Sequence, residues 1–588
     1  TIGITADDAG NYQIDVPANA TTLVFSSVSH TEHEEIIGTR TVINVQLSPS
    51  AETLEQVVVV GYGTMAREAI SGSVGNVSSK KLENLPALSV DKLLGGKVAG
   101  MSVGSATGQP GAASQIRIRG TSSINAGNEP LYVIDGIPVE SGDQSYFTNT
   151  SNALTSLNPN DIESISVLKD AAAAAIYGSR AANGVILVTT KKGRIGRASF
   201  TARAKFGVAW LANDNNTEAM SGEELLNFQR VAATNAGYNP DDPNDTYYRP
   251  LSLLDNGTTD WMDHFTRLGK IQEYEITAQA GSDKTKFYSS FNYQDQEGIF
   301  YGINFKRLSG RLNIDQKLTN TLTMGANVNL AYTDADDLQM QSLYFINPMW
   351  AGFRILPWTP AYDAKGNHNV NIPENSGQNP RATAAYDKQY SKQYRIFANP
   401  YMEWAPIPEL VFKTNNAIDI MFEEGLRYWD KRSSLSRTEN NSQSSTSKFQ
   451  TITTSNTAQF TKTFDDIHDV RVLVGQEASK YIRDARYISA PDVDDLIPYP
   501  NTSPAARDNA SFAMVTRTLM SFFGTANYNF NKKYYLDLSL RTDGSSLFAE
   551  GNRWGWFWSV GGSWSIHRES FMENVNFIDN LKLRASYG

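Results

Sequence analysis

The sequence predicts a mainly β chain, in which a small β-sandwich and an α/β unit precede part of a transmembrane antiparallel β-barrel. Three observations lead to this fold class. From about residue 197 onward, apolar and polar residues alternate over long segments, as in strands with one apolar and one wet face. Tight turns and long loops alternate between these segments. No apolar run approaches the roughly 20 residues of a membrane-spanning helix, so a membrane role must rest on strands.

The composition narrows the classes of function. At 588 residues the chain exceeds one ordinary core, which indicates several domains or one large barrel. It contains no cysteine, which excludes disulfides, thiolate catalysis and cysteine-ligated metals. The formal net charge is -10 and no basic stripe is present, so a nucleic-acid partner is not expected, because phosphate binding needs a basic surface.

Residues 1–48 are predicted to form the β-sandwich, incomplete at its start. A turn is expected at Asp8–Asn11, and strands are expected at Leu23–Val28 and Val42–Leu47. Because Thr1 already begins within this strand-rich region, we expect the true N-terminus to lie upstream.

Residues 49–81 form a linker that carries one apolar run. Four valines, Val57–Val60, are followed by Gly61, Tyr62 and Gly63. This pattern predicts a short strand that can pair at an exposed edge. Two other interpretations remain open, namely a further strand of the first domain and an aggregation-prone edge.

The clearest part of the α/β unit is Asp161–Gly193. Ile165 and Val167 alternate with serines, which predicts a half-buried strand. Asp170 is the expected N-cap of a short alanine-rich helix, and Gly178 is its expected C-cap.

A second strand is predicted after this helix. The turn signal Asn183–Gly184 precedes the apolar run Val185–Val188, so the order is strand, helix, strand. Upstream, Ile116–Gly120 (IRIRG) and Leu131–Val139 (LYVIDGIPV) are predicted as strands of the same domain, which spans residues 82–193.

The segment 194–588 shows the alternation most clearly in two predicted strands. In the first, Leu308, Gly310, Leu312 and Ile314 oppose Arg307, Ser309, Arg311, Asn313 and Asp315. In the second, Met520, Phe522, Gly524, Ala526, Tyr528 and Phe530 oppose Ser521, Thr525, Asn527 and Asn529. Apolar-out and polar-in faces are what a membrane barrel with a wet lumen requires.

The connections follow the same plan. Tight turns are expected at Gly281–Asp283, Leu318–Thr321, Ala405–Glu409, Phe464–Ile467 and Asn531–Lys533. Long loops are expected at Asn213–Gly269, Asp334–Lys392, Glu423–Gln443 and Ile482–Ser511. The pattern predicts about thirteen strands, which short turns join at one end of the barrel and long loops join at the other.

Together these segments resemble the plug and barrel of TonB-dependent outer-membrane transporters. Two segments are most similar in sequence to the SusC-like nutrient importers: VLKDAAAAAIYGSRAANGVILVTTKKG from Val167, and VVVVGYGT from Val57. The stretches RTDGSSLFAEGNRWGWFWSVGGSWSI and LKLRASYG near the end of the chain resemble barrel strands of the same family. The resemblance covers nearly the whole chain.

The resemblance implies four parts. Residues 1–48 correspond to a carboxypeptidase-regulatory-like domain, the linker 49–81 contains the TonB box, and 82–193 form the plug. Residues 194–588 then form the N-terminal part of a barrel of about 22 strands. The implied TonB box is Val57, Val58, Val59, Val60, Gly61 and Tyr62, and the implied plug motif is Arg117, Arg119, Gly120, Asp135, Gly136, Lys169, Asp170, Tyr177, Gly178, Arg180, Asn183 and Gly184.

The resemblance also implies a function and partners. The implied function is that of an active importer in the outer membrane of a Gram-negative bacterium, with the first domain and the TonB box in the periplasm. TonB would pull the box, a SusD-like surface lipoprotein would act as a lid, and the cargo would be an oligosaccharide or a peptide. Outer-membrane lipid would surround the barrel. The alternatives are a siderophore-type TonB-dependent receptor and, in a different class, a β-barrel adhesin.

The sequence offers no catalytic set. No nucleophile, base and orienting group can be assembled, and a glycan hydrolase would need an acid and base pair that the spacing does not supply. The glycine-rich stretch Gly95–Gly111 lacks the Lys-Ser/Thr ending of a phosphate loop. The aromatic stripe Trp554, Trp556, Trp558 and Trp564 shares a face with Val560 and Ile566, which favours a lipid-facing girdle over a sugar platform.

Metal binding is not expected, and no cofactor is predicted. His30 and His33 are three residues apart, so on a strand their rings point to opposite faces. Acidic groups in loops, which are mostly solvated, leave calcium as an alternative; they are Asp241, Asp242 and Asp245, and Asp492, Asp494 and Asp495.

Arg117 and Arg119 lie two residues apart on a predicted strand and should therefore project to one side. Such a pair needs partners if it is buried. We expect these two arginines to hold the plug against the barrel wall, with Asp135, Asp161, Glu163 or polar barrel residues as partners.

Overall fold

The computed structural model describes residues 4, 6, 10–17, 20–25, 33–47, 57–66, 69–82, 88–105, 107–124, 127–148, 150–212, 219–338, 345–500, 509–573, 575 and 577–588. The chain divides into two compact units. The first contains Thr1–Val59 and Gly63–Ile70, and the second contains Val60–Tyr62 and Ser71–Gly588. Among the described residues, no helix combines the length and the apolar character needed to cross a membrane.

The first unit contains short strands. β1 (Thr22–Phe25) pairs antiparallel with β2 (His33–Ile36), and β3 (Val57–Val60) pairs with β4 (Gly63–Ala66), which places a reversal at the two residues between them. The strand predicted at Val42–Leu47 is wrong, because these residues form no strand and join no sheet in the described structure. The phenol of Tyr12, and not a strand ladder, anchors Ile43 by donating to its carbonyl at 2.7 Å. The β-sandwich stays a prediction.

The plug of the second unit is built on a five-stranded sheet in the order β5-β10-β11-β8-β9. Only β11 and β8 are parallel to each other. A separate hairpin pairs β6 with β7. The strands are β5 (Val74–Ser78), β6 (Met101–Ser105), β7 (Ser114–Ile118), β8 (Leu131–Ile134), β9 (Ile137–Val139), β10 (Ile162–Leu168) and β11 (Val185–Thr190). The helical pieces are α1 (Ser79–Leu82), α2 (Val90–Leu93), η2 (Ala153–Ser156), η3 (Pro159–Asp161), α3 (Ala171–Ala174) and η4 (Ala175–Ala181).

The predicted order of strand, helix and strand over Asp161–Gly193 is confirmed by β10, α3 with η4, and β11. Two details differ. Leu131–Val139 forms a tight hairpin, not one strand, because Asp135 and Gly136 adopt positive φ values of 49° and 86°. Gly178 lies inside η4 at a kink with φ 61° and does not cap the helix.

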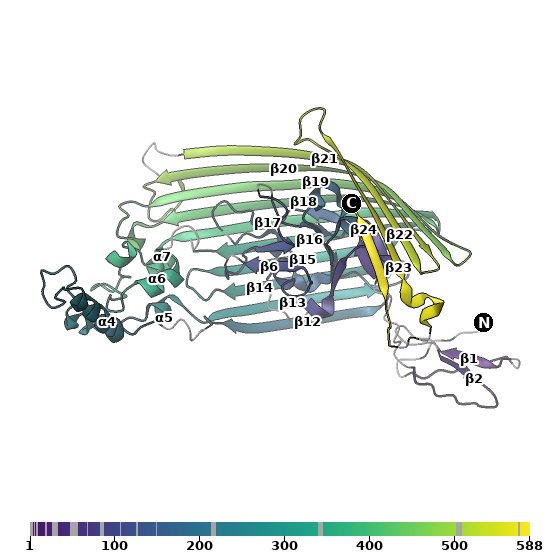
Figure 1. Cartoon of the computed structure of the whole chain (residues 1–588), viewed down its shortest axis with the longest axis horizontal. Helices are drawn as coiled ribbons and strands as arrows, with labels where there is room; N and C mark the ends of the chain where they lie inside the picture. The colour runs from purple at the N-terminus through teal and green to yellow at the C-terminus, as the bar shows by residue number, and fades with distance from the viewer. Residues whose placement is uncertain are drawn as a thin grey trace. The chain divides into compact units, whose positions relative to one another are not determined.

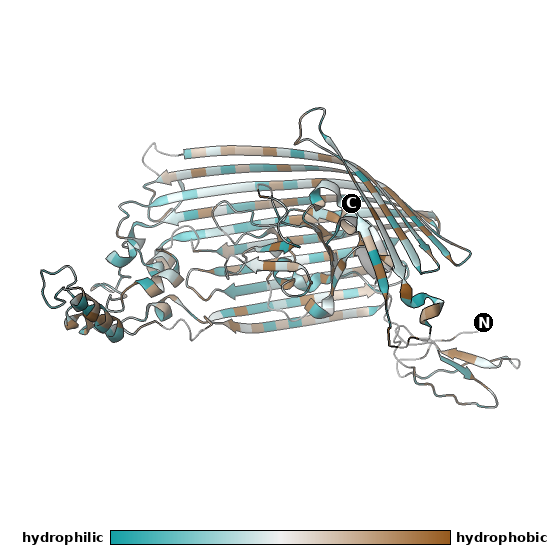
Figure 2. Ribbon diagram, in the orientation of Figure 1, coloured by the Kyte–Doolittle hydropathy of each residue, from teal (hydrophilic) through white to brown (hydrophobic). Residues whose placement is uncertain are grey.

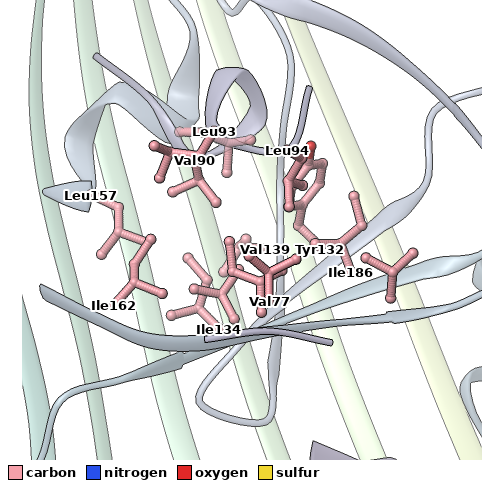
Figure 3. Close-up of a cluster of buried hydrophobic side chains, with 14 of the residues drawn as sticks. Val77, Val90, Leu93, Leu94, Tyr132, Ile134, Val139, Leu157, Ile162 and Ile186 are labelled. Carbon is pink, nitrogen blue, oxygen red and sulfur yellow. The ribbon is translucent and has the colours of Figure 1, made fainter. Parts of the chain in front are cut away.

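The plug has its own hydrophobic core (Figure 3). Val77, Leu94 and Ile134 from different elements pack together, and the cluster continues to Phe397 and Ala417 of the large sheet. Strand β10 is more deeply buried than predicted: Ser166 is 1% exposed, like its apolar neighbours. The plug sheet therefore has no solvent-facing side at Ser166, although Glu163 and Ser164 earlier in the strand remain partly exposed.

Thirteen antiparallel strands, each paired with the next in sequence, form the large sheet, as predicted (Figure 1). Within the described residues β12 and β24 are its two edges, so the sheet does not close into a barrel. The strands are β12 (Gly196–Ala209), β13 (Gly269–Gly281), β14 (Thr285–Glu297), β15 (Asn304–Lys317), β16 (Leu322–Asp336), β17 (Lys388–Ile407), β18 (Leu410–Trp429), β19 (Asn441–Phe464), β20 (His468–Pro491), β21 (Asn509–Phe530), β22 (Tyr534–Ser545), β23 (Trp554–Ser565) and β24 (Lys582–Tyr587).

The two faces of this sheet differ in polarity, and Figure 2 shows apolar and polar residues alternating along the strands. On β15 the apolar Leu308 and Leu312 are 41% and 45% exposed, whereas Arg307 and Arg311 are 1% and 3% exposed. We call the face that carries Arg307 and Arg311 the inner face, because the plug packs against it. Apolar residues are exposed and charged residues are buried, which is the reverse of the usual pattern in soluble proteins. This confirms the predicted alternation of apolar-out and polar-in residues.

The predicted tight turns are all present, and the helices from α4 to η8 lie in the long connections at the other end of the strands (Figure 1). The short helices η10 and η11, between β23 and β24, lie at the same end as the tight turns, where Lys533 contacts Glu569 at 3.0 Å. Two loops are shorter than predicted because β18 to β21 run on beyond their apolar stretches through serine-rich and arginine-rich segments. The helices of the connections are α4 (Gly222–Asn235), η6 (Leu251–Leu254), α5 (Trp261–Phe265), α6 (Pro348–Arg354), η7 (Pro373–Asn375), α7 (Pro380–Tyr386), η8 (Lys431–Ser433), η10 (Ile566–Arg568) and η11 (Ser570–Met572).

The tryptophan stripe lies on β23. Trp554, Trp556 and Trp558 are 53%, 67% and 49% exposed on the outer face. Trp564 is half-buried, and its indole N–H donates to Glu569 at 3.0 Å. Ile566 does not share this face, because β23 ends at Ser565 and η10 begins there. The girdle stays a prediction for the three outward tryptophans.

Candidate functional site

The predicted TonB box ends at a contact between plug and wall. Gly61 and Tyr62 follow β3, and Tyr62 adopts a left-handed backbone with φ 58°. The Tyr62 ring lies between two aromatic rings, with centroids 5.6 Å from Tyr177 of the plug and 4.3 Å from Phe523 of β21. The side chains of Val57–Val59 lie outside the described residues.

The Tyr62 phenol donates to a carboxylate of the wall. Its oxygen lies 2.6 Å from Oε2 of Glu477, a β20 residue that is 1% exposed. Burial raises the pKa of Tyr62 well above its usual range, and the nearby Glu477 carboxylate acts in the same direction. The phenol therefore remains protonated and acts as a donor at physiological pH.

Two arginines share the Glu477 carboxylate. Arg180, in the plug element η4, donates to Oε1 of Glu477, and Nη2 of Arg541 on β22 lies 3.6 Å from the same oxygen. The Nε of Arg541 in turn donates to Asp543 at 2.6 Å. Two cations and two carboxylates thus balance, as a buried charge cluster requires.

Backbone groups of the plug complete this contact. Nη1 of Arg541 donates to the carbonyl of Ile176 at 2.7 Å, and Asp543 accepts from N and Oγ of Ser179 at 2.9 and 3.0 Å. A Cβ on Gly178 would overlap both Asp543 and Arg541. Glycine at this position therefore lets η4 approach the wall closely. We call the group Tyr62, Tyr177, Arg180, Glu477, Phe523, Arg541 and Asp543 the Tyr62 latch.

A second contact is centred on Arg311 of β15. Its Nη1 lies 3.0 Å from Oγ1 of Thr190 and 3.4 Å from Asp135, and its Nε lies 3.8 Å from Asp161. Asp135 also accepts from N and Oγ1 of Thr190, and Asp161 accepts from the phenol of Tyr288 at 2.8 Å. This site joins a wall cation to two plug carboxylates that are nearly inaccessible to solvent.

Two further wall arginines bind plug carbonyls. Arg307 donates to the carbonyl of Leu88 at 2.9 Å. Arg395 donates to the carbonyl of Ala153 at 2.7 Å and is paired with Asp419 at 2.6 Å. Four arginines of the barrel wall thus bond to groups of the plug: Arg307, Arg311, Arg395 and Arg541.

The expected role of Arg117 and Arg119 is wrong. Arg117 pairs with Glu129 and Arg119 lies 3.8 Å from Asp170, so both partners belong to the plug itself. Arg119 also follows the end of β7 with φ 58°, so the two side chains do not share a strand face. The arginines that link plug to wall are instead Arg307, Arg311, Arg395 and Arg541 of the barrel, together with Arg180 of the plug.

The other plug-motif residues shape the plug internally. Lys169 donates to the carbonyl of Ala99 at 3.1 Å, and the carboxylate of Asp170 accepts from the backbone N of Ser73 at 2.9 Å. Asn183 donates to the carbonyls of Gly127 and Glu129. Three glycines adopt the positive φ of tight reversals; they are Gly120, Gly136 and Gly184.

The residues that were considered for metal binding lie in other parts of the chain. His30 lies outside the described residues, and His33 contacts Glu35 at 3.3 Å. Within the described part of the chain, no group of three or more histidine, aspartate or glutamate side chains is arranged to hold a metal. In the acidic loops, Asp241 pairs with Arg230 at 2.9 Å and Asp495 lies 3.3 Å from Lys431.

The sequence did not reveal the wall residues of these contacts individually. Arg307 and Arg311 were placed on the polar face by alternation, but nothing in the local pattern distinguished them from other inward residues. Glu477, Arg541 and Asp543 lie hundreds of positions from Tyr62. A charged residue on the inner face of a predicted barrel strand was the one available signal.

Two family models match the chain. The TonB-dependent Receptor Plug Domain matches residues 66–185, and the TonB dependent receptor-like, beta-barrel model matches residues 351–588. The first covers the plug from β5 to η4 and ends where β11 begins. The second covers β17 to β24 with the loops before β17.

Relatives align along the whole chain. TonB-dependent receptor P26 of Formosa agariphila is 32% identical over 606 residues, covering 100% of this chain and 58% of the relative. TonB-dependent receptor SusC of Bacteroides thetaiotaomicron is 29% identical over 627 residues, covering 100% of this chain and 58% of SusC. The chain thus spans little more than half the length of these relatives.

A solved structure shares the fold. The RagAB peptide importer in its open-open state matches with a TM-score of 0.79 and 28% identity, covering 90% of this chain and 61% of that chain. The relatives are named as receptors and an importer, and not as enzymes.

Proposed function

Because the chain belongs to the SusC-like TonB-dependent receptors, we propose that it serves the active import of a large nutrient across the outer membrane of a Gram-negative bacterium. The cargo is an oligosaccharide or a peptide, the two classes suggested by its likeness to SusC and to the RagAB peptide importer. A SusD-like surface lipoprotein is the proposed partner at the outer loops.

The energy for import must come from outside the outer membrane, since this membrane is permeable to small ions and has no ATP on either side. TonB supplies it by adding a strand to the box at Val57–Val60. Strand addition suits this task because main-chain hydrogen bonds give grip with little side-chain matching.

The observation that carries the proposal is the position of Tyr62, the last residue of the box, inside the contact between plug and wall. A pull on Val57–Val60 draws first on Tyr62. Loss of Tyr62 takes a donor from Glu477 and a ring from between Tyr177 and Phe523. Force at the box is therefore delivered where η4 of the plug is bonded to the wall.

The test is deletion of Val57–Val60 in the full-length receptor. We expect energised uptake to be abolished, while folding and surface binding of substrate persist. Deletion of Ala51–Leu54, which shortens the linker equally but keeps the box, should leave uptake intact. Uptake that survives loss of Val57–Val60 would show the force path to be wrong.

The alternatives predict other results. A siderophore-type receptor would purify without a lid lipoprotein, whereas co-purification of a SusD-like partner supports the proposal. An adhesin has no use for a plug. Deletion of residues 82–193 should raise the conductance of single channels, and unchanged conductance would favour the adhesin.

A further inference from the structure

Two neighbouring cavities share the side chain of Trp429, at the end of β18 beside the outer loops. The first has a volume of about 290 Å³ and lies between the ends of β16 and β18, the start of β17, and α7. The second has a volume of about 420 Å³ and lies over the ends of β18, β19 and β20. Both volumes are at the small end of the range for ligand pockets, which is about 300–1,000 Å³.

Trp429 and Arg427 lie on the inner face of the sheet, whereas the first cavity is also lined by residues of the other face, such as Lys388 and Tyr428. Trp429 is paired in register with Asn441, and Arg427 is paired with Gln443. Gln443 is in turn paired with Ser489. Residues paired in register lie on the same face, so these side chains form one continuous strip across three strands.

The charges that line the two cavities balance in number. Three carboxylates line the first cavity, and three cations line the two cavities together; they are Asp336, Asp337 and Asp387, and Lys388, Arg427 and Arg437. Asp387 is held by Arg437 at 2.9 Å, and Asp336 accepts from Asn304 at 3.0 Å. An ionised ligand would therefore meet no net opposite charge.

The second cavity is lined mainly by neutral hydrogen-bonding groups. Besides Trp429 and the paired Arg437, it presents Gln378, Asn441, Gln443 and Ser489. Amides and hydroxyls both donate and accept, as sugar hydroxyls do. An aromatic ring with several such groups around it is a common arrangement for binding a neutral polar ligand with one apolar face.

A bound peptide usually gains affinity by pairing its main chain with a free strand edge. Here β16, β17, β18 and β19 are each paired on both sides, up to the ends that line the cavities. The end of β20 is the exception, because Ala490 and Pro491 line the second cavity and pair with β19 but with no described residue of β21. The choice of an oligosaccharide over a peptide therefore rests on Trp429 and on the neutral hydrogen-bonding lining of the second cavity.

The first cavity is also joined to the plug. The guanidinium of Arg427 lies over the rings of Phe147 of the plug and Trp429, at 5.2 and 5.4 Å, and its Nη2 donates to the Phe147 carbonyl at 2.6 Å. Asp337 accepts from Gln109, also of the plug. A ligand that bonds to Arg427 or Asp337 therefore competes with the plug for the same groups, which links its binding to plug position.

We propose that the strip centred on Trp429 is a binding site for a neutral oligosaccharide, with two adjoining subsites, and that its occupancy weakens the Arg427 and Asp337 contacts to the plug. The inference rests on the proposed function, since it selects one of the two cargo classes.

The test is calorimetric titration of the purified full-length receptor in detergent, without TonB. The probes are maltoheptaose, cellohexaose, xylohexaose, mannohexaose and laminarihexaose, with polygalacturonate oligomers and a tryptic digest of casein as the acidic and peptide arms. We expect a neutral oligosaccharide to bind, and Trp429→Ala to weaken that binding at least tenfold. Trp429→Phe, which keeps a ring, should weaken it much less.

Two further variants are measured, one as a control and one as a second test of the site. Trp404→Ala removes a tryptophan that is 46% exposed on the outer face of β17 and should leave affinity unchanged. Should Trp429→Ala lower the melting temperature, Gln443→Ala tests the second cavity with Trp429 in place, and a loss of about fivefold is expected. Binding of no neutral oligosaccharide, binding of the acidic or peptide arm alone, or binding indifferent to Trp429→Ala and Gln443→Ala overturns the proposal. None of these results depends on energised uptake, so failure here is separate from failure of the import test.

Discussion

The phenol of Tyr62 donates a 2.6 Å hydrogen bond to Glu477, although the two residues lie 415 positions apart. Tyr62 ends the segment that we propose TonB pulls, and Glu477 is a buried residue of the wall. The same carboxylate binds Arg180 of the plug and lies near Arg541 of the wall. The Glu477 carboxylate therefore connects the box, the plug and the barrel.

Removal of the Tyr62 hydroxyl should release the box. A hydrogen bond to a charged group contributes about 1.5–3 kcal/mol, so Tyr62→Phe should raise the population with a free segment by tenfold or more. We expect the C-terminal domain of TonB to bind this variant about tenfold more tightly in titrations, and Tyr62→Ala more tightly still because the ring stacking is also lost. Tyr12→Phe removes a phenol that bonds a backbone carbonyl in the first unit and should change nothing. Equal TonB affinity in all variants would contradict the latch.

Gly178 should not tolerate a side chain. A Cβ there would overlap Asp543 and Arg541, and overpacking of this kind costs about 1–3 kcal/mol. Gly178→Ala should therefore speed hydrogen exchange in η4 and the adjoining strand β11. Gly120→Ala is the matched control, because Gly120 also has a positive φ, 102°, but open space around it. Equal effects of the two substitutions would mean that backbone strain alone, not contact with the wall, explains Gly178.

Arg311 should be far more important for plug retention than Arg119. Arg311→Met leaves Asp135 and Asp161 buried without their cation, and breaking a buried pair costs about 3–5 kcal/mol. We expect raised channel conductance and sensitivity to large antibiotics in cells. Arg119→Met removes a half-exposed partner of Asp170, a contact worth about 0–1 kcal/mol, and should leave both readouts unchanged. A leak in Arg119→Met but not in Arg311→Met would restore the role expected from the sequence.

The sequence predicted that Arg117 and Arg119 bind the wall, whereas in the structure Arg311 of the wall binds the plug. The difference shows what the sequence pattern can and cannot predict. Period-two alternation identified the strands of the wall, because a sheet between lipid and a wet interior must separate apolar from polar residues residue by residue. It correctly placed Arg307 and Arg311 on the inner face. Alternation carries no information about which inward residue meets the plug, since that depends on contacts between residues hundreds of positions apart.

Local rules failed where backbone geometry or burial was set by distant partners. Leu131–Val139 has the composition of one strand, but the reversal at Asp135–Gly136 brings the Asp135 carboxylate to Thr190 and Arg311. Gly178 has the position of a helix cap, yet its freedom serves the approach to Asp543. Both misjudged residues belong to the contact between plug and wall.

The outer loops should respond to acid through two histidines. The His264 ring lies 6.3 Å from His368 and 5.5 Å from Tyr362, beside the buried Trp261 and Phe265. Neither His264 Nε2 nor His368 Nδ1 has a hydrogen-bond partner among the described residues.

Burial lowers the pKa of both histidines, and the charge of Arg381 lowers it further; for His264, the charge on His368 acts the same way and Asp263 opposes it. Both rings are therefore neutral in the packed loop. When the loop opens, their pKa returns to about 6.5, so the open form binds more protons below that pH. Stability of the packed loop is then full above pH of about 6.5 and declines as the pH falls toward the lowered values of the packed state.

Hydrogen exchange of the α5 amides should accordingly be faster at pH 5 than at pH 7.5, after correction for the intrinsic pH dependence. His264→Phe with His368→Phe should flatten this difference, because a phenylalanine ring fills similar space and takes up no proton. His468→Phe is the control, since its ring packs 5.1 Å from Phe530, away from α5, and should leave the α5 profile unchanged. If the double variant kept the wild-type acid response, protonation of these two rings could not be its cause, and the acidic groups around α5 would have to be tested in their place.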